Sequence, residues 1–540
     1  MKEDKKINIK FNVLAIISII IFSFAVAQKT LQNDTFYTIK IGEYILKNGI
    51  TMQDPFSWHT LSYTFPHWAY DVLIYLIYNV CGNIGVYIST IMLTAILGII
   101  IYYMNNKFTK NKPITLILTI ASLFLLKGFL AARAQLVTFI LFALELLFIE
   151  GYLDTKKKRY AAGLIIIPIL IANFHVAVFP FYFVIYLPYI AEYLLYILFD
   201  AEGSVKRKIN RTEKKIEKNK DIKKQEKLKE KLEDLKNRLE RLQNSKKNDT
   251  YKIRIVKREN IKYLIIIMII CIFTGLLTPL KDVPYTYLLK TLKGNSTQNI
   301  SEHLPLTLIE DTKFIIVIVL FLAVLTFTDS KIRLCDLFML GGLTFMTFMS
   351  RRQESLFVIF CIPIFNRMVT ELFDKYDKGG IEKMTKMMAS ICGNIITISL
   401  IILISIVCYG NKNKNSYINE KIYPVEACQW IKENLNLNEI KLYNGYNYGS
   451  YLILQDIPVF IDSRADLYLP EFNKGVKIFE DFLNIGNLNI TNLEEKFEQY
   501  GFTHFLIQID SRLVIYFEAK PDIYNKIYSD ENFCIYERKK

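Results

Sequence analysis

The chain has 540 residues, of which 52% are hydrophobic, and its formal net charge is +15. A single soluble core cannot absorb so large an apolar fraction at this length, so the composition excludes one soluble domain and indicates a protein that crosses a membrane several times. The positive charge is interpreted as a topology signal and as attraction to membrane lipid, so no nucleic-acid partner is expected.

Apolar windows of roughly 18 residues, long enough to cross the hydrocarbon core, recur between short charged loops. The first window follows a basic start and ends at the small-residue sequence AVAQ. Its apolar run is long for a signal peptide, so it is interpreted as a retained helix. We predict about eleven spans, near residues 11–28, 84–104, 113–127, 135–152, 160–174, 176–198, 261–278, 313–328, 334–350, 355–369 and 389–409.

The loops rich in lysine and arginine, including the segment before the first span, fall on one side of the membrane when these spans are counted in order. Positively charged loops mark the cytoplasmic side. The sequence therefore predicts a multi-pass protein of the cell membrane, with a cytoplasmic N-terminus and an extracytoplasmic C-terminal region.

Three parts are expected: a membrane core over residues 1–409 with an outer first loop at 29–70, a charged insertion at 202–260 within the core, and a polar region at 411–540. In the insertion, leucines alternate spacings of four and three, which is typical of a short coiled coil or a helical hairpin. A solvated basic insertion near anionic lipid is favoured over a partner-binding module. These leucines are Leu228, Leu232, Leu235, Leu239 and Leu242.

The C-terminal region alternates helix-like and strand-like patterns, as a small α/β domain does. Cys428 and Cys534 lie in this region and can pair, although nothing in their spacing requires it. The predicted fold class is mainly α: a polytopic membrane helical bundle with a small extracytoplasmic α/β domain. In that domain, helices are predicted near 424–435, 445–455 and 492–501, and strands near 440–444, 458–462, 503–509 and 533–539.

The predicted topology sorts the unusual polar residues by side of the membrane. Ionisable residues at span ends are costly to place in lipid, so converging ones usually face a cavity or pair with each other. Each residue taken alone is more simply explained as an ordinary loop residue or helix end, but the set favours a shared outer pocket. The residues placed on the outer face are Asp34, Asp54, His59, His67, Arg133, His175, Glu302, His303, Arg351, Arg352 and Glu354.

Candidate roles follow from the chemistry of these side chains. A hydroxyl that attacks an activated sugar needs a carboxylate base within hydrogen-bonding reach, and Asp34 or Asp54 can supply it. A departing lipid phosphate needs fixed positive donors. Guanidinium groups bind phosphate oxygens in bidentate fashion, which suits Arg133, Arg351 and Arg352 to that role.

Other outer residues have two uses each. His175, between two spans, can donate to phosphate or cap a helix end. The loop that carries Glu302 and His303 is long enough to fold back over a pocket, and Trp68 can stack on a sugar ring, although an interfacial aromatic belt uses tryptophan in the same way. Together with His59, these are the candidates for contact with the substrate.

The order of several short motifs resembles a known family. The chain has an acidic residue just after the first span, then DPFSWHT and PHWAYD, AARAQ and NFH turns, a TPL segment leading to ISEHLPL, and SRRQESLF. This series is similar to the bacterial multi-pass GT-C-type glycosyltransferases, which use polyprenyl-phosphate-linked sugars. The C-terminal YNGYNYGSYLILQDIPVFIDSRADLY is similar to the corresponding end of some members, so the resemblance covers most of the chain apart from the insertion.

The resemblance implies that Asp34 is the base that activates the acceptor and that the outer arginines lie near the donor phosphate. It implies a polyprenyl-phosphate-linked sugar as donor and a glycan, lipid or protein as acceptor. Many members carry a paired acidic motif in the first loop, whereas Asn33 and Thr35 flank Asp34 here. Some members use a divalent metal, which Asp34 can bind together with Asp54 or Glu302, but no cofactor is certain.

Two other functions are compatible with the sequence. A transporter of polysaccharide or lipid carrier would line its path with charged residues in the middle of spans, whereas here they gather at outer span ends. A non-catalytic envelope assembly or sensor protein would bind a ligand through Asp462, Arg464 and Asp466 of the C-terminal region.

Overall fold

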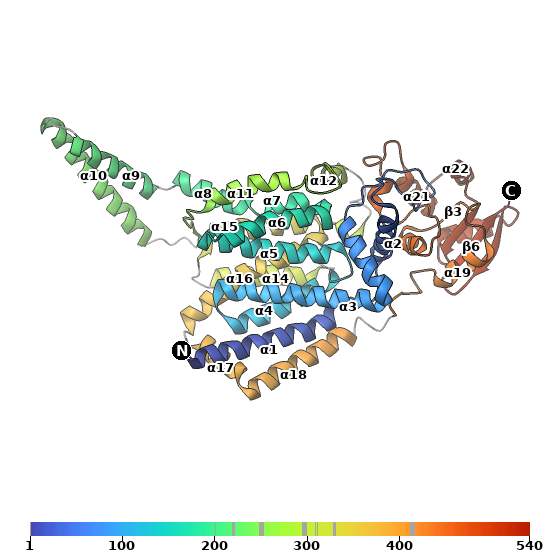
Figure 1. Ribbon diagram of the computed structural model, residues 1–540, viewed down its shortest axis with the longest axis horizontal. Helices are drawn as coiled ribbons and strands as arrows, with labels where there is room; N and C mark the ends of the chain where they lie inside the picture. Colours follow the sequence, from blue (N-terminus) through green and yellow to red (C-terminus); the bar gives the residue numbers. More distant parts are fainter. Residues whose placement is uncertain are drawn as a thin grey trace.

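The computed structural model describes residues 2–199, 201–218, 222–247, 253–293, 300–307, 309, 311–327, 331–377, 379–410 and 416–539. The molecule is elongated, with a bundle of helices in the middle, a helical pair projecting from one end and a mixed α/β domain covering the other (Figure 1). The chain begins at the end that carries the helical pair. We call the two ends of the bundle the N-terminal end and the C-domain end.

The bundle is made of helices whose sequences are apolar on all sides, as expected for segments that face lipid or other helices rather than water. Of the described helices, six are long and apolar enough to cross a membrane, and three shorter ones are also apolar. These findings support a membrane protein, while the number of eleven spans stays a prediction. The six candidate spans are Lys6–Val26, Trp68–Thr109, Ala134–Thr155, Val176–Leu198, Arg351–Tyr376 and Ile391–Gly410, and the shorter helices are Ile261–Thr274, Thr312–Phe327 and Leu334–Met349.

The bundle elements run in chain order from the N-terminal end. They are α1 (Lys2–Val26), α3 (Trp68–Thr109), α4 (Lys112–Leu125), η1 (Leu126–Gly128), α5 (Ala134–Thr155), α6 (Lys158–Phe174), η2 (Val176–Val178), α7 (Phe179–Val184), α8 (Leu187–Phe199), α11 (Ile261–Thr274), α12 (Val283–Lys293), η3 (Ser301–His303), α14 (Thr312–Phe327), α15 (Leu334–Met349), η4 (Arg351–Gln353), α16 (Glu354–Tyr376), α17 (Gly380–Ala389) and α18 (Ile391–Gly410). Buried ion pairs join several of them at the N-terminal end, where Glu150 accepts from Arg258 at 2.8 Å and from Arg333 at 3.1 Å. Arg333 lies in β2 (Ile332–Arg333), which pairs in parallel with β1 (Ile253–Arg254).

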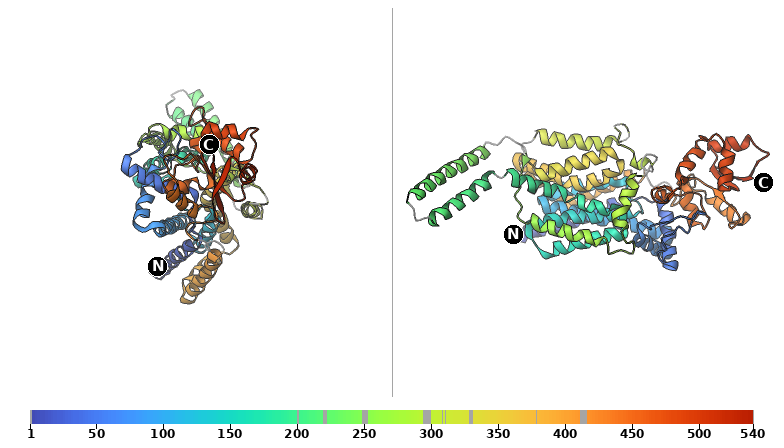
Figure 2. Two further views of the ribbon diagram at one scale, coloured as in Figure 1. Left: turned by 90° about the vertical axis from the view of Figure 1, so that its right-hand side faces the viewer. Right: turned by 90° about the horizontal axis from the view of Figure 1, so that it is seen from above.

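The charged insertion forms a helical hairpin that stands away from the bundle. Its two helices, α9 (Ala201–Lys218) and α10 (Ile222–Lys247), run antiparallel, and Val205 and Ile209 pack against Leu235. Figure 2 shows from a second direction that this hairpin and the C-terminal domain lie at opposite ends of the molecule. Of the two forms that the leucine spacing allows, the structure has the hairpin within one chain.

The segment after α1 folds into a compact layer at the C-domain end rather than into an open loop. It contains α2 (Asn33–Asn48), a turn region, and the first part of α3. The 42-residue α3 breaks at Gly82, whose φ of +59° is a conformation that glycine adopts without a steric penalty. This break lets the beginning of α3 pack on α2 while the remainder enters the bundle.

The C-terminal domain has a four-stranded sheet with the order β3-β4-β6-β5. β3 and β4 are parallel, and the other two pairs are antiparallel. Helices cover the sheet. The elements are α19 (Val425–Asn434), β3 (Leu442–Tyr443), α20 (Tyr446–Leu454), η5 (Ala465–Tyr468), α21 (Ile478–Gly486), α22 (Leu493–Tyr500), β4 (His504–Gln508), α23 (Arg512–Glu518), β5 (Tyr524–Ser529) and β6 (Phe533–Arg538).

Two expectations about this domain need correction. The strand predicted at 458–462 is wrong, because Val459 forms a single bridge with Ser57 of the first outer segment instead of joining the sheet. β5 was not predicted, because its sequence is polar at the positions that face water. Cys428 and Cys534 are both buried as free thiols, so the pairing that the sequence allowed is not formed.

The first outer segment and the C-terminal domain share one hydrophobic core. Phe36 of α2 contacts Tyr423 and Tyr451 of the C-terminal domain edge to face, with ring centroids 4.8 and 5.2 Å apart. Backbone hydrogen bonds add to this packing, since Leu31 donates to Tyr417 at 2.8 Å. The two segments therefore form a single rigid layer over the C-domain end of the bundle.

Candidate functional site

An arginine bridges two carboxylates at the C-domain end of the bundle. Arg133 forms an ion pair with Asp34 through one terminal nitrogen, and its other terminal nitrogen lies 2.9 Å from Glu302 Oε1. The side chains of Asp34 and Arg133 keep 24% and 23% of their surface exposed. The group is therefore built into the fold but accessible to a ligand.

Local structure places each member of this group. Asp34 lies in the first turn of α2, where the helix dipole favours a negative charge. Arg133 is the extended residue that precedes α5, and Glu302 belongs to the short helix η3. Thr35 donates to the carbonyl of Ala132 at 3.0 Å, which holds the start of α2 against the start of α5.

The C-terminal domain also contacts Asp34. The Ser463 hydroxyl hydrogen bonds to the Asp34 carboxylate, and Ser463 is held by Ser450 at 2.8 Å. Burial raises the pKa of Asp34, but the Arg133 guanidinium and the Ser463 hydrogen bond outweigh that effect and hold the pKa below its ordinary value of 3.8. Asp34 is therefore ionised at neutral pH.

Arg352, His175 and His303 lie beside this group. The side chain of Arg352 makes no hydrogen bond or ion pair with another residue of the described part of the chain. Burial and the nearby Arg352 guanidinium lower the pKa of His303 to about 4 and hold the pKa of His175 well below its usual range. Both histidines are thus neutral, and His175 Nδ1 is hydrogen bonded to Thr138 Oγ1 at 2.8 Å. A guanidinium flanked by neutral imidazoles can accept a phosphate group.

A second acid lies close to Asp34 through a histidine. His67 Nδ1 is 2.9 Å from Asp71 Oδ1, and His67 Nε2 is 3.3 Å from the Tyr37 hydroxyl. Asp71 is completely buried in the first turn of α3, and its Oδ2 has no hydrogen-bond partner among the described residues. The charge of His67 is felt at Asp34, which places the two groups near each other.

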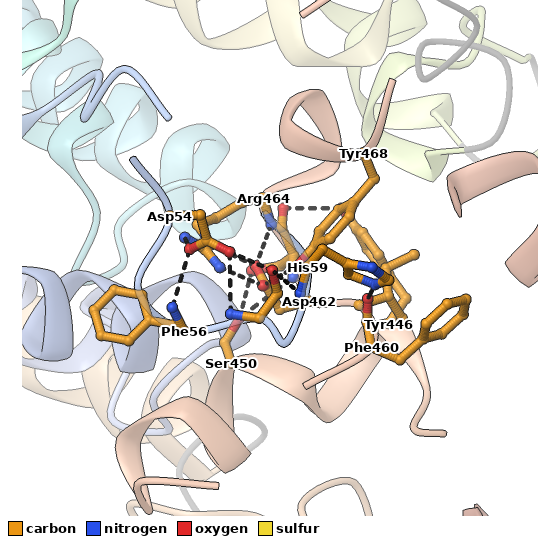
Figure 3. A network of polar contacts seen from close by, with 12 residues as sticks. Asp54, Phe56, His59, Tyr446, Ser450, Phe460, Asp462, Arg464 and Tyr468 are labelled. Carbon is orange, nitrogen blue, oxygen red and sulfur yellow. Dashed lines mark hydrogen bonds and ion pairs between the residues drawn. The ribbon is translucent and has the colours of Figure 1, made fainter. Parts of the chain in front are cut away.

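Asp54 belongs to a different network from Asp34. It accepts hydrogen bonds from the backbone of Phe56 and Ser57, and Arg464 donates to it at 2.6 Å. Arg464 also pairs with Asp462 at 2.7 Å, and all three side chains are almost completely buried (Figure 3). Asp54 therefore fastens the first outer segment to the C-terminal domain and is not brought together with Asp34.

The structure places three further candidate residues in packing or pairing contacts. His59 Nε2 is 3.0 Å from the carbonyl of Phe460, and burial lowers the pKa of His59 to about 4 (Figure 3). Trp68 donates to Asn173 at 3.1 Å within an apolar cluster. Arg351 forms an ion pair with Asp311 at 3.2 Å. None of the three contacts Asp34.

Sequence reasoning brought together Asp34, Arg133, Glu302, His303, Arg352 and His175 and missed the partners of Asp34 from other elements. Ser463 gave no signal, since it lies in a polar connection. His67 and Asp71 gave a weak one, because an aspartate four residues after a histidine, at the start of an apolar helix, can face it.

The donor set does not fit a divalent cation. Asp34 and Glu302 are the two acids that meet here, and the Arg133 guanidinium lies between them. The described residues include no group of three or more His, Cys, Asp or Glu side chains arranged to hold a metal ion. We therefore derive no step through a metal.

Solved structures of one enzyme resemble this fold, although no family model and no curated protein matches the chain. The oligosaccharyltransferase of Archaeoglobus fulgidus, tethered to an acceptor peptide containing the NVT sequon, is 12% identical with a TM-score of 0.52, over 98% of this chain and 74% of that chain. Its apo form is 11% identical with a TM-score of 0.52, over 92% of this chain and 70% of that chain. At these identities the likeness shows the fold alone, which is that of a GT-C-type glycosyltransferase.

Proposed function

We propose that the protein is an integral membrane glycosyltransferase that moves a sugar from a polyprenyl-phosphate donor to a glycan, lipid or protein acceptor outside the cytoplasm. The observation that carries the proposal is the ionised, partly exposed Asp34, set beside Arg352 at the C-domain end of a GT-C-type fold. A base and a phosphate-binding cation at one place are what this transfer requires.

In the proposed reaction, the oxygen of the acceptor hydroxyl attacks the anomeric carbon of the donor sugar. The bond from that carbon to the phosphate oxygen breaks, and its electron pair leaves with the lipid phosphate. Asp34 takes the hydroxyl proton, and Arg133 and Ser463 hold the carboxylate in place. Arg352 binds the departing phosphate, and the neutral His175 and His303 can donate hydrogen bonds to it.

The test compares envelope glycans by mass spectrometry from a strain that lacks the protein and from strains that carry the wild type or Asp34→Asn. We expect one sugar to be missing from the deletion strain, restored by the wild type and absent with Asp34→Asn. Asp481→Asn is a matched control, because Asp481 also pairs with a cation, Lys496, but lies in the C-terminal domain away from Asp34. Unchanged glycans in the deletion strain would remove the proposed function, and wild-type transfer by Asp34→Asn would remove Asp34 from the mechanism.

One observation favours a transporter as the second candidate. Glu145 lies in the middle of α5, is fully buried, and has no hydrogen-bond partner among the described residues for either carboxylate oxygen. Acidic residues in the middle of spans are typical of ion and substrate paths. The Arg133 group, with its two carboxylates and the nearby Arg352, is better suited to group transfer.

A further inference from the structure

We propose that Tyr37, His67 and Asp71 form a proton relay that removes the acceptor proton from Asp34 during sugar transfer. The inference rests on the proposed function and adds residues that the motif resemblance does not assign. Tyr37 and His67 would carry the proton, and Asp71 would be a positioning residue.

The need for a relay arises from the Arg133 ion pair. A carboxylate whose pKa is held low by a guanidinium binds a proton only weakly, so a proton taken by Asp34 must leave quickly for another acceptor. Tyr37 lies one helical turn after Asp34 on α2, and residues at this spacing share one face of a helix. The Tyr37 hydroxyl is therefore on the face that carries Asp34.

The next step is the contact between Tyr37 and His67. Asp71 accepts a hydrogen bond from His67 Nδ1, so the proton of the neutral imidazole resides on that nitrogen and Nε2 is left as an acceptor. Nε2 faces the Tyr37 hydroxyl at 3.3 Å, and the two rings stack with centroids 5.9 Å apart. The His67 side chain keeps 13% of its surface exposed, which allows the proton to leave afterwards.

The relay balances without another reactant. Asp34 gives the proton to the Tyr37 oxygen while the Tyr37 hydroxyl proton moves to His67 Nε2. Asp34 returns to a carboxylate, Tyr37 is again neutral, and His67 becomes an imidazolium beside Asp71. Solvent then takes the proton from His67.

The surroundings of Asp71 favour the charged histidine. Asp71 Oδ2 lacks a partner in the described structure, so the buried carboxylate is under-compensated while His67 is neutral. A positive charge on His67 would pair with it. The simpler explanation is that the pair only pins the turn before α3, but the backbone nitrogen of Asp71 already donates to the His67 carbonyl at 3.0 Å and fixes that turn.

The test measures the initial rate at which cells or membranes add the identified sugar to envelope glycans. We expect His67→Gln to lower this rate about 100-fold and Tyr37→Phe about 10-fold, within the usual contribution of acid–base groups. His504→Gln and Tyr448→Phe are matched controls, because these residues are hydrogen bonded in the C-terminal domain, to Thr503 and to the carbonyl of Leu506. The controls should retain the wild-type rate.

A second measurement separates a chemical role from a structural one. Added imidazole should restore at least 10-fold of the rate lost in His67→Gly, since a small imidazole can enter the space and accept the proton. A rate within threefold of wild type in both His67→Gln and Tyr37→Phe, or a folded His67→Gly that imidazole does not restore, would overturn the relay. If the wild type itself adds no sugar, the proposed function fails instead.

Discussion

Arg464 and Asp54, 410 positions apart in the chain, form a buried ion pair with a distance of 2.6 Å. The contact joins the C-terminal domain to the segment that carries Asp34. Because Ser463 precedes Arg464 directly and hydrogen bonds to Asp34, the ion pair also positions a residue of the candidate site.

Replacing Arg464 should detach the C-terminal domain. Arg464→Gln leaves Asp54 and Asp462 buried without their cation, which costs about 3–5 kcal/mol when a buried pair loses one partner. We expect a lower apparent Tm and faster cleavage of the domain by protease. Lys526→Gln, which breaks the half-exposed pair with Glu518, should leave both unchanged. Equal protease resistance in Arg464→Gln and wild type would show that the pair does not hold the domain.

Replacing Arg133 should change how the transfer rate depends on pH. Without the guanidinium, burial raises the pKa of Asp34, so the carboxylate becomes protonated at a higher pH. In the wild type the charged form persists as pH falls to its ordinary value of 3.8 and is lost only below it. We therefore expect the acid limb of the rate profile of Arg133→Gln to move to higher pH.

The control for this profile is Arg538→Gln. Arg538 also contacts two carboxylates, those of Glu494 and Glu498, but lies in the C-terminal domain. Its acid limb should match that of the wild type. An unshifted limb in Arg133→Gln would show that Arg133 does not set the charge of Asp34.

Gly42 permits the close packing of α2 on α3. A Cβ atom at Gly42 would collide with the backbone carbonyl of Asp71 and lie 2.6 Å from Tyr75 Cβ. Gly42→Ala should lower stability by about 1–3 kcal/mol, the usual cost of overpacking, and reduce transfer because His67 and Asp71 move. Gly342→Ala, which meets nothing within 4 Å, should have no such effect in thermal unfolding.

Glu145 distinguishes the enzyme from the transporter. Glu145→Gln keeps the shape of the side chain and removes its capacity for charge. If the protein is a glycosyltransferase, the rate of sugar addition should stay within about twofold of wild type, because Glu145 lies in the middle of α5 and does not act in the transfer. A large loss of glycan with Glu145→Gln, alongside normal glycan with Asp34→Asn, would favour transport.

The sequence predicted the helical core, the hairpin insertion and most of the C-terminal domain because these depend on local periodicity. It also grouped Asp34 with Arg133, since both follow from counting sides of the membrane. It could not place Asp54 or His59, because their environment is an interface with residues 459–464 at the far end of the chain. Long-range contacts of this kind leave no periodic pattern.

The contact between Ser463 and Asp34 sets an order on biosynthesis. The ribosome makes Asp34 among the first residues and Ser463 among the last, after every helix of the bundle. A late stop codon would thus yield a chain that inserts normally and yet lacks one of the groups that hold Asp34. Catalytic competence would be the final property that a newly made molecule acquires.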